Sequence, residues 1–219
     1  HMAIHEDSDI PALILREVYG FTTNPTIQPT SDNVVAYGAG TLVVVWDWKH
    51  QQQRPLAGHD RNVTSVSFAP DGSTLASADD TRIHLWDAHA DWLHLKILQC
   101  PSIYQSKISV SKSPLEGFEG QIRFLAFMSP DVLVALDISR DNTKSTPNQR
   151  LLSWSIRSAS TTARAFSFDE DEVVDLCVDP DLQSVFCCSP TALCAWICPS
   201  LSKTAPAALA SSWRLDWSR

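Results

Sequence analysis

No stretch of this chain approaches the roughly 18 consecutive apolar residues of a membrane-spanning helix, and its N-terminus has no secretory signal. We therefore expect a soluble, cytoplasmic protein that does not bind membranes. None of its six cysteines falls in a C-x-x-C pair. Cys194 and Cys198 are four residues apart, but on a strand this spacing separates the side chains by about 13 Å, too far to share a zinc ion. The sequence predicts reduced thiols, no metal site and no cofactor.

Positive charge is also scarce. The chain has 17 Lys and Arg against 25 Asp and Glu, a formal net charge of -8. This balance argues against direct nonspecific binding to nucleic acid, because phosphates require a basic footprint. It also weakens direct microtubule binding, because the tubulin surface is acidic and any contact needs a local cluster of Lys and Arg. The acidic run 169–172 lacks the glycine-containing ligand pattern of a calcium loop and is interpreted as a solvated turn.

The chain does contain one stretch, residues 58–87, with a clear strand, turn, strand pattern. Apolar residues between 63 and 68 follow a near-β period, and Asp71-Gly72 supplies the left-handed backbone of a tight hairpin turn. A third strand is predicted over 82–86, where His84 alternates with apolar neighbours.

This stretch, GHDRNVTSVSFAPDGSTLASADDTRIHLWD, resembles the WD repeat from its Gly-His start to its Trp-Asp end. The resemblance implies a buried network in which His59 bonds Asp80, while Ser77 and Trp86 complete the set. An imidazole that donates to a carboxylate and accepts from a hydroxyl leaves no polar atom unpaired, so the network stabilises the sheet. The same residue types could form a Ser-His-Asp hydrolase triad, but Ser77 lies inside a strand pattern, without the exposed elbow that a nucleophile needs.

The same strand order recurs along the chain, and a tryptophan closes each unit. Propeller blades recur at roughly 40 to 45 residues. Trp46 and Trp86 are 40 residues apart, Trp154 follows after 68 because of a long loop, and Trp196 follows after 42. We therefore expect an all-β WD-repeat β-propeller with about four consecutive blades. The residues six positions before the other three closing tryptophans are Gly40, Asn148 and Pro190. The polar network is thus predicted only in the second blade.

These units divide the chain as follows. Residues 1–2 are interpreted as the remnant of an expression tag, 3–24 as an N-terminal extension, and 99–120 as a loop insert. The four blades cover 25–57, 58–98, 121–168 and 169–219. A seven-bladed ring of about 42 residues per blade needs about 300 residues. The chain is therefore predicted to be a partial propeller, or a fragment of a larger one, that self-associates through exposed blade edges.

Two interpretations stay open for the ends of the chain. In the first, Ala12–Val18 forms an edge strand that closes a ring against the last blade, with Trp213–Trp217 as the matching outer strand. In the second, Ala12–Val18 only caps the first blade, and Trp213–Trp217 is the fourth strand of the last one.

Two loops, 99–120 and 139–148, exceed the median loop length of about 4 to 6 residues. Specificity is expected in such loops, because a rigid propeller leaves its connections free to vary. The candidate partner-contact residues are Tyr104, Lys107, Lys112, Phe118, Arg140, Lys144 and Arg150. The alternative interpretation is that the basic residues among them are solvated loop charges.

Beyond the single repeat, the order VYGF, VVAYGAGTLVVVWDW, AGHDRNVTSVSF, IRFLAF and LLSWSI is similar to the echinoderm-microtubule-associated-protein-like family and to flagella-associated WD-repeat proteins. This resemblance implies a noncatalytic protein-protein interaction scaffold at microtubules, centrioles or cilia. An adaptor in ubiquitin ligation, RNA processing or signalling stays open, because fold does not decide function. An enzyme is not expected, since no converging set of titratable groups can be assembled beyond the structural network.

Overall fold

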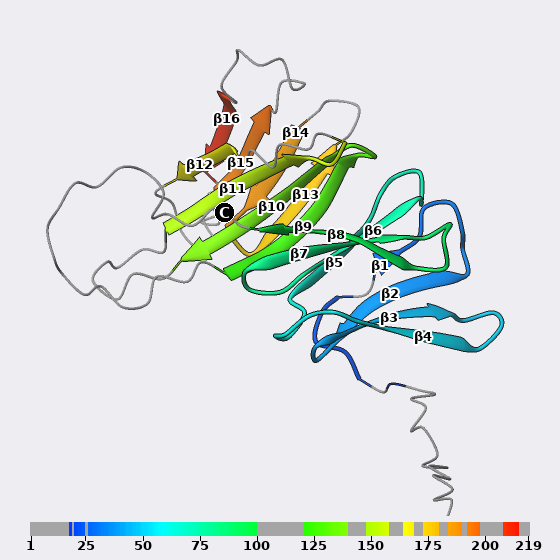
Figure 1. Cartoon of the computed structure of the whole chain (residues 1–219). Helices are drawn as coiled ribbons and strands as arrows, with labels where there is room; N and C mark the ends of the chain where they lie inside the picture. Colours follow the sequence, from blue (N-terminus) through cyan, green and yellow to red (C-terminus); the bar gives the residue numbers. More distant parts are fainter. Residues whose placement is uncertain are drawn as a thin grey trace, which may run out of the picture.

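The computed structural model describes residues 18, 20–24, 26–99, 121–139, 148–157, 164–168, 173–179, 184–189, 192–197 and 208–214. These residues form four antiparallel sheets of four strands each, which follow one another along the chain (Figure 1). The all-β architecture is as predicted. Among the described residues, no helix has the length and apolar character to cross a membrane.

The strands of each sheet pair in the order in which they occur in the sequence. Sheet A contains β1 (Thr26–Ile27), β2 (Val34–Ala39), β3 (Leu42–Asp47) and β4 (Gln52–Ala57). Sheet B contains β5 (Ser65–Phe68), β6 (Thr74–Ala78), β7 (Arg82–Asp87) and β8 (Leu93–Gln99). Sheet C contains β9 (Gln121–Ser129), β10 (Val132–Ser139), β11 (Asn148–Ser155) and β12 (Arg164–Phe168). Sheet D contains β13 (Asp175–Asp179), β14 (Ser184–Cys188), β15 (Ala192–Ile197) and β16 (Ala208–Arg214).

Short turns account for this meander. The β5–β6 turn carries Gly72 with a φ of 70°, the left-handed conformation anticipated for the Asp71-Gly72 pair. Asp71 fixes the same turn, because its Oδ1 accepts hydrogen bonds from the backbone N–H and the hydroxyl of Ser73. Gly40 has a φ of 61° in the turn between β2 and β3. These turns bring each strand back beside the one before it.

The sheets pack against one another through apolar side chains, in the order A, B, C, D. The residues buried between sheets A and B include Val43, Val45, Leu56, Val66 and Trp86. Those between sheets B and C include Ile83, Leu85, Leu98, Leu133 and Trp154. Those between C and D include Leu136, Leu151, Val173 and Val185. Full burial of each such side chain contributes about 1.5 to 3 kcal/mol, so these three interfaces hold the array together.

Hydrogen bonds also join neighbouring sheets, next to the start of each following sheet. In each one, a backbone N–H close to or at the beginning of a first strand reaches the preceding sheet. The bonds run from Val63 to the Gly40 carbonyl (2.8 Å), from Ile122 to the Asp80 carbonyl (3.2 Å), and from Val173 to Gln149 Oε1 (2.6 Å). In the last junction a side-chain amide takes the role that a turn carbonyl has in the first two.

The C-terminal strand completes sheet D. Trp213 and Arg214 lie on β16, which pairs with β15. β16 begins at Ala208, earlier than the predicted outer strand 213–217, and both interpretations of the chain ends stay predictions. Residues 12–17 and 215–217 lie outside the described residues.

Candidate binding groove and buried polar network

Sheet B contains a buried polar network around His59. His59 Nδ1 lies 2.8 Å from Asp79 Oδ2, and His59 Nε2 lies 2.7 Å from Ser77 Oγ. Trp86 Nε1 donates to the same Ser77 oxygen at 2.8 Å. Since a carboxylate only accepts, His59 Nδ1–H donates to Asp79, and Nε2 of the neutral ring accepts from the Ser77 hydroxyl. All four residues are buried, and the bonds join the segment before β5 to β6 and β7.

The acid of this network is Asp79, so the prediction of Asp80 is wrong. Asp79 follows the end of β6 directly, and its Oδ1 accepts from the backbone N–H groups of Thr81 and Arg82 at 2.9 and 2.8 Å. That turn holds its carboxylate inside the sheet. The Asp80 side chain lies at the surface instead, 3.8 Å from Arg61. Counting back from Trp86 cannot separate two adjacent acids, whereas the turn-forming pattern of Asp79 could have done so.

Burial and hydrogen bonding set the charges of the network. Burial lowers the pKa of His59 and outweighs the opposite effect of the Asp79 carboxylate, so the ring is neutral at pH 7. Burial raises the pKa of Asp79, but the bonds from His59 and from two backbone N–H groups lower it further, to a net value below the usual range. The network therefore holds a neutral imidazole and a charged carboxylate.

The geometry is also that of a Ser-His-Asp triad, but its surroundings differ from those of a nucleophile. Ser77 is 0% exposed, and its oxygen accepts from Trp86. A substrate carbonyl has no route to this oxygen in the observed arrangement. The network is therefore structural here, and its bonds tie the strands of sheet B together.

His84 on β7 is a further member of this cluster that sequence reasoning did not single out. Because His84 alternates with Ile83 and Leu85, its side chain lies on the opposite face of sheet B. It is nevertheless only 2% exposed, because both faces of the sheet are covered. Its ring centroid lies 4.1 Å from that of His59 and 5.0 Å from that of His94. Burial, followed by the neighbouring His59 and His94, lowers the pKa of His84 to about 4. Neither ring nitrogen has a hydrogen-bond partner among the described residues.

The closing tryptophans occupy one equivalent register in all four sheets. Each pairs with a residue of the middle strand: Val35 with Trp46, Leu75 with Trp86, Leu133 with Trp154, and Val185 with Trp196. Trp86 and Trp154 are buried and Trp46 is half-buried. The repeat of strand and tryptophan therefore extends through the whole array.

Register also shows what replaces the network elsewhere. Ser77 lies two residues after Leu75, and the equivalent residues of sheets A, C and D are Tyr37, Ala135 and Cys187. The serine bridge is thus particular to sheet B, in line with the prediction. Asp137, however, lies four residues after Leu133, as Asp79 does after Leu75, and it is 1% exposed. Counting back from Trp154 missed this acid because a longer loop separates β10 from β11.

A groove of about 700 Å³ lies where the first strands of the four sheets begin. We call it the strand-start groove. Its lining comes from residues 21–24 before β1, 62–64 before β5, 121–124 of β9, and 173–174 before β13. The strands β5, β9 and β13 contact one another in sequence, which brings these distant segments together. The groove residues were not predicted from the sequence. The segments that line it are far apart in the chain, and only the packing of the first strands of neighbouring sheets brings them together.

The predicted partner-contact residues are not the ones that form this groove. Tyr104, Lys107, Lys112, Phe118, Arg140 and Lys144 lie outside the described residues. Arg150 lies on β11, where its backbone pairs with Asp137 and Ser167. No observation therefore tests these residues as contact positions, and they stay predictions.

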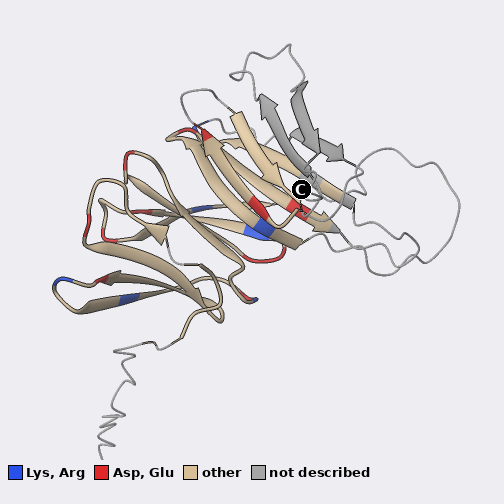
Figure 2. Ribbon diagram, turned by 180° about the vertical axis from the view of Figure 1, so that it is seen from behind, with Lys and Arg blue, Asp and Glu red and all other residues tan. Residues whose placement is uncertain are grey.

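Basic residues are scattered over the described ribbon. Figure 2 shows Lys and Arg mostly as single short segments between uncharged stretches. Four of the arginines pair with acids, in the pairs Arg54–Asp91, Arg61–Asp80, Arg82–Asp60 and Arg157–Asp131. Within the described part of the chain, these pairs offset much of the positive charge that an acidic partner surface would need.

Comparison with known proteins identifies the repeat. The family model "WD domain, G-beta repeat" matches residues 50–87, which contain β4 to β7 and the network residues. The chain contains a WD repeat. Its four-sheet, all-β architecture is that of a WD-repeat β-propeller with about four blades, consistent with a partial propeller.

Two curated relatives match over similar lengths. The transcriptional corepressor LEUNIG_HOMOLOG of Arabidopsis thaliana is 30% identical over 89 residues, 39% of this chain. Elongator complex protein 2 of Saccharomyces cerevisiae is 34% identical over 87 residues, 37% of this chain. In both cases the matched part spans only 11% of the relative.

A solved structure, the β-propeller domain of Cps50 (Swd1) from Myceliophteria thermophila, is 15% identical to this chain. The match covers 92% of this chain and 75% of that one, with a TM-score of 0.49.

Proposed function

We propose that this protein is a noncatalytic scaffold for protein-protein interactions and that its strand-start groove binds an extended segment of a partner protein. WD repeats indicate an interaction scaffold. The observation that supports the proposed site is that segments at the starts of all four sheets line one groove. A rigid array that presents one shared concave surface suits binding better than four separate surfaces would.

The chemistry of the groove suits an extended peptide. Its floor is apolar, with Val63, Ile122 and Val173 all buried. Two apolar side chains stand exposed at its edge, Phe21 at 67% and Val174 at 55%. Such exposed apolar groups are suited to anchor a partner by burying their surface.

Polar side chains complete the lining. Asn24, Asn62 and Gln121 each carry an amide that donates and accepts hydrogen bonds, as a peptide backbone does. Apolar anchors for side chains and amides for the backbone are the two elements of extended-peptide recognition.

The lining also supports a noncatalytic role. Arg123 is the one ionisable residue among the described residues that line the groove. General acid-base catalysis needs a positioned group that can exchange a proton near neutral pH, and an arginine does not. The Ser77 hydroxyl, which could have acted as a nucleophile, is buried within sheet B.

The cellular setting is proposed on the resemblance to microtubule-associated and flagella-associated WD-repeat proteins, and it places the scaffold in a cytoplasmic, cytoskeletal or ciliary assembly. The second candidate is an adaptor in an assembly that acts in transcription or RNA processing. The names of the two curated relatives, a corepressor and a subunit of Elongator, favour this second candidate.

A capture experiment with matched variants tests the groove. The full chain is used as bait against lysates of ciliated cells and nuclear extracts, beside a groove variant, Val174→Asp. The control is Leu95→Asp on β8, since Leu95 is exposed to a similar extent at 48% and does not line the groove. We expect specific partners to be lost about tenfold with Val174→Asp, because an interface anchor contributes about 1 to 2 kcal/mol or more, and to be retained with Leu95→Asp.

Equal retention by both variants would refute the groove as the binding site. The identity of the partners decides the setting. Tubulin or axonemal proteins would support the cytoskeletal candidate, and subunits of transcription or Elongator complexes would support the second. A binary binding measurement with each purified partner then separates direct contact from co-capture.

A further inference from the structure

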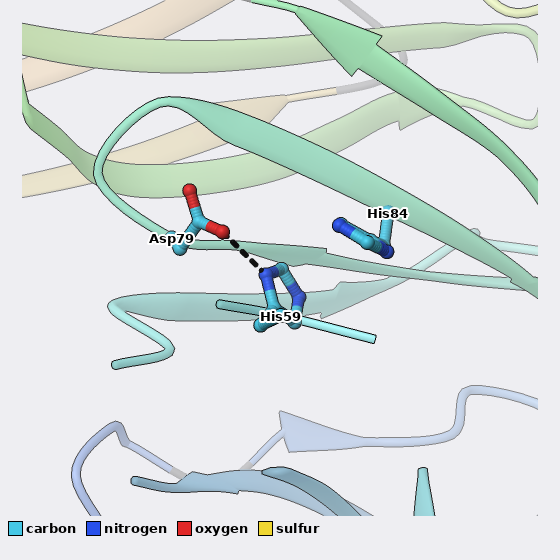
Figure 3. A group of neighbouring side chains, drawn as sticks. All are labelled: His59, Asp79 and His84. Atoms are coloured by element: carbon cyan, nitrogen blue, oxygen red, sulfur yellow. Dashed lines mark hydrogen bonds and ion pairs between the residues drawn. The ribbon is translucent and has the colours of Figure 1, made fainter. Parts of the chain in front are cut away.

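Three side chains converge on one point inside sheet B. His59, Asp79 and His84 each offer one ligand atom, and these atoms lie within 4.8 Å of one another (Figure 3). His59 precedes β5, Asp79 follows β6 and His84 lies on β7, so the backbone of three segments fixes their positions. All three residues are buried.

The two histidines differ in what they bond. His59 uses both ring nitrogens, toward Asp79 and Ser77. His84 uses neither among the described residues, although it is 2% exposed. A buried imidazole without partners loses its hydrogen bonds to water and gains none in return. In Figure 3 the His84 ring lies beside His59, with one nitrogen directed toward the other two side chains.

We propose that His59, Asp79 and His84 bind one Zn²⁺ ion. Imidazole nitrogens and carboxylate oxygens are ligands that zinc accepts, at about 2.0 to 2.2 Å. In a tetrahedral site these distances place the ligand atoms about 3.4 Å apart. Closing the observed cluster onto an ion therefore asks His84 to move inward by about an ångström and the His59–Asp79 pair to open by about half an ångström.

The rest of the network can remain bonded when the ion enters. An ion bound at His59 Nδ1 takes the place of the proton that this nitrogen shares with Asp79. That proton moves to Nε2, which then donates to Ser77, so the Ser77 oxygen accepts from both His59 and Trp86. The Ser77 hydroxyl hydrogen gives up its bond to Nε2 in this exchange, so one hydrogen bond is traded for the bond to the ion. The backbone N–H groups of Thr81 and Arg82 go on holding the other oxygen of Asp79, as outer groups commonly do in zinc sites.

A further histidine lies beside the cluster. His94 on β8 is exposed, and its ring centroid lies 5.0 Å from that of His84. We expect water or His94 to supply the fourth ligand of the ion. The Asp79 carboxylate balances one of the two charges of the ion.

Zinc titration of the full chain tests the site. The protein is first treated with a chelator, which is then removed, and binding is measured by calorimetry with ZnCl₂. The variant is His84→Leu, because leucine already occupies the equivalent position of sheet C as Leu152. The control is His50→Asn, which removes an exposed histidine that pairs with Asp47. A separate titration with Co²⁺ reports the ligand geometry by absorption.

We expect one Zn²⁺ to bind per chain in the unsubstituted protein and in His50→Asn, with tetrahedral Co²⁺ bands, and affinity to fall at least about 100-fold in His84→Leu. Nitrogen chemical shifts of the His59 and His84 rings are followed in parallel on the unsubstituted protein, so that the result stands even if the variant fails to fold. The proposal is overturned if the unsubstituted protein binds no zinc, if His84→Leu folds and binds it as tightly, or if neither ring responds.

Discussion

Sheets B and C are built on the same plan and fill it with different chemistry. Both place a buried tryptophan opposite a leucine of the middle strand, Trp86 opposite Leu75 and Trp154 opposite Leu133. In sheet B the indole N–H donates to Ser77, whereas Trp154 Nε1 has no hydrogen-bond partner within the described residues. The buried tryptophan ring is therefore the shared element, and the polar network is an addition to it.

The residue pair two positions away from each leucine–tryptophan pair explains why only Trp86 of the two has a hydrogen-bond partner among the described residues. Sheet B has Ser77 opposite His84, and sheet C has Ala135 opposite Leu152 at the same register. The first pair belongs to a network that stabilises sheet B by directional hydrogen bonds, and the loss of one partner leaves the others unsatisfied. The second relies on apolar burial, which has no such directional requirement. Exchanging features between the two sheets tests this difference.

The largest effect is expected from the acid of sheet B. Asp79→Ala leaves His59 and the backbone N–H groups of Thr81 and Arg82 without their acceptor, and should lower the free energy of unfolding by about 3 kcal/mol. Asp80→Ala is the matched control: its backbone carbonyl, which the substitution keeps, joins the next sheet, and its half-exposed ion pair with Arg61 contributes at most about 1 kcal/mol. Urea denaturation of both variants measures the difference. A larger loss with Asp80→Ala would return the network role to Asp80.

The second largest effect is expected in the pH dependence of stability, which sheet B should have through His84 and sheet C should lack at the equivalent Leu152. The pKa of His84 is about 4 in the folded protein and about 6.5 in an unfolded chain, so the unfolded state binds more protons between these values. Stability therefore falls as pH decreases through this window, by about 2 kcal/mol between pH 7 and pH 5 from His84 alone. His59 acts in the same direction, because its pKa is also lowered.

His84→Leu, which gives sheet B the residue found in sheet C, should remove most of that pH dependence. Urea denaturation at a series of pH values, with a chelator present to keep metal out, measures both proteins. Identical slopes would show that burial of His84 does not govern the acid response.

The smallest effect is expected from the reverse exchange. Ala135→Ser introduces a hydroxyl into sheet C at the register of Ser77, where it can accept from Trp154 Nε1. Net stabilisation by such a bond is about 1 kcal/mol at most, less the cost of burying the hydroxyl. Thermal unfolding measures the change in stability. The control is Ala76→Ser in sheet B, which places a hydroxyl at a buried alanine outside this register. A loss equal to that of the control would show that the tryptophan environments are not equivalent.

The sequence predicted the strands well and the site only in part. The alternation of apolar residues, the Asp71-Gly72 turn and the spacing of the tryptophans were enough for four meandering sheets, because these signals are local. The choice between Asp79 and Asp80 depended on which side chain the turn directs inward. The burial of His84 depended on a neighbouring sheet covering its face, and the acid Asp137 was missed because loop length changes the count from Trp154. The groove could not be predicted, since it forms from segments that only the packing of all four sheets brings together.

The junctions between sheets have a consequence for the groove. Val63, Ile122 and Val173 line its floor, and the backbone N–H of each bonds to the preceding sheet. A partner seated on this floor would touch every joint of the array at once and oppose the separation of any one of them. Occupancy would thus couple the packing equilibria of the three junctions into a single transition, so that a bound protein would unfold more abruptly than a free one.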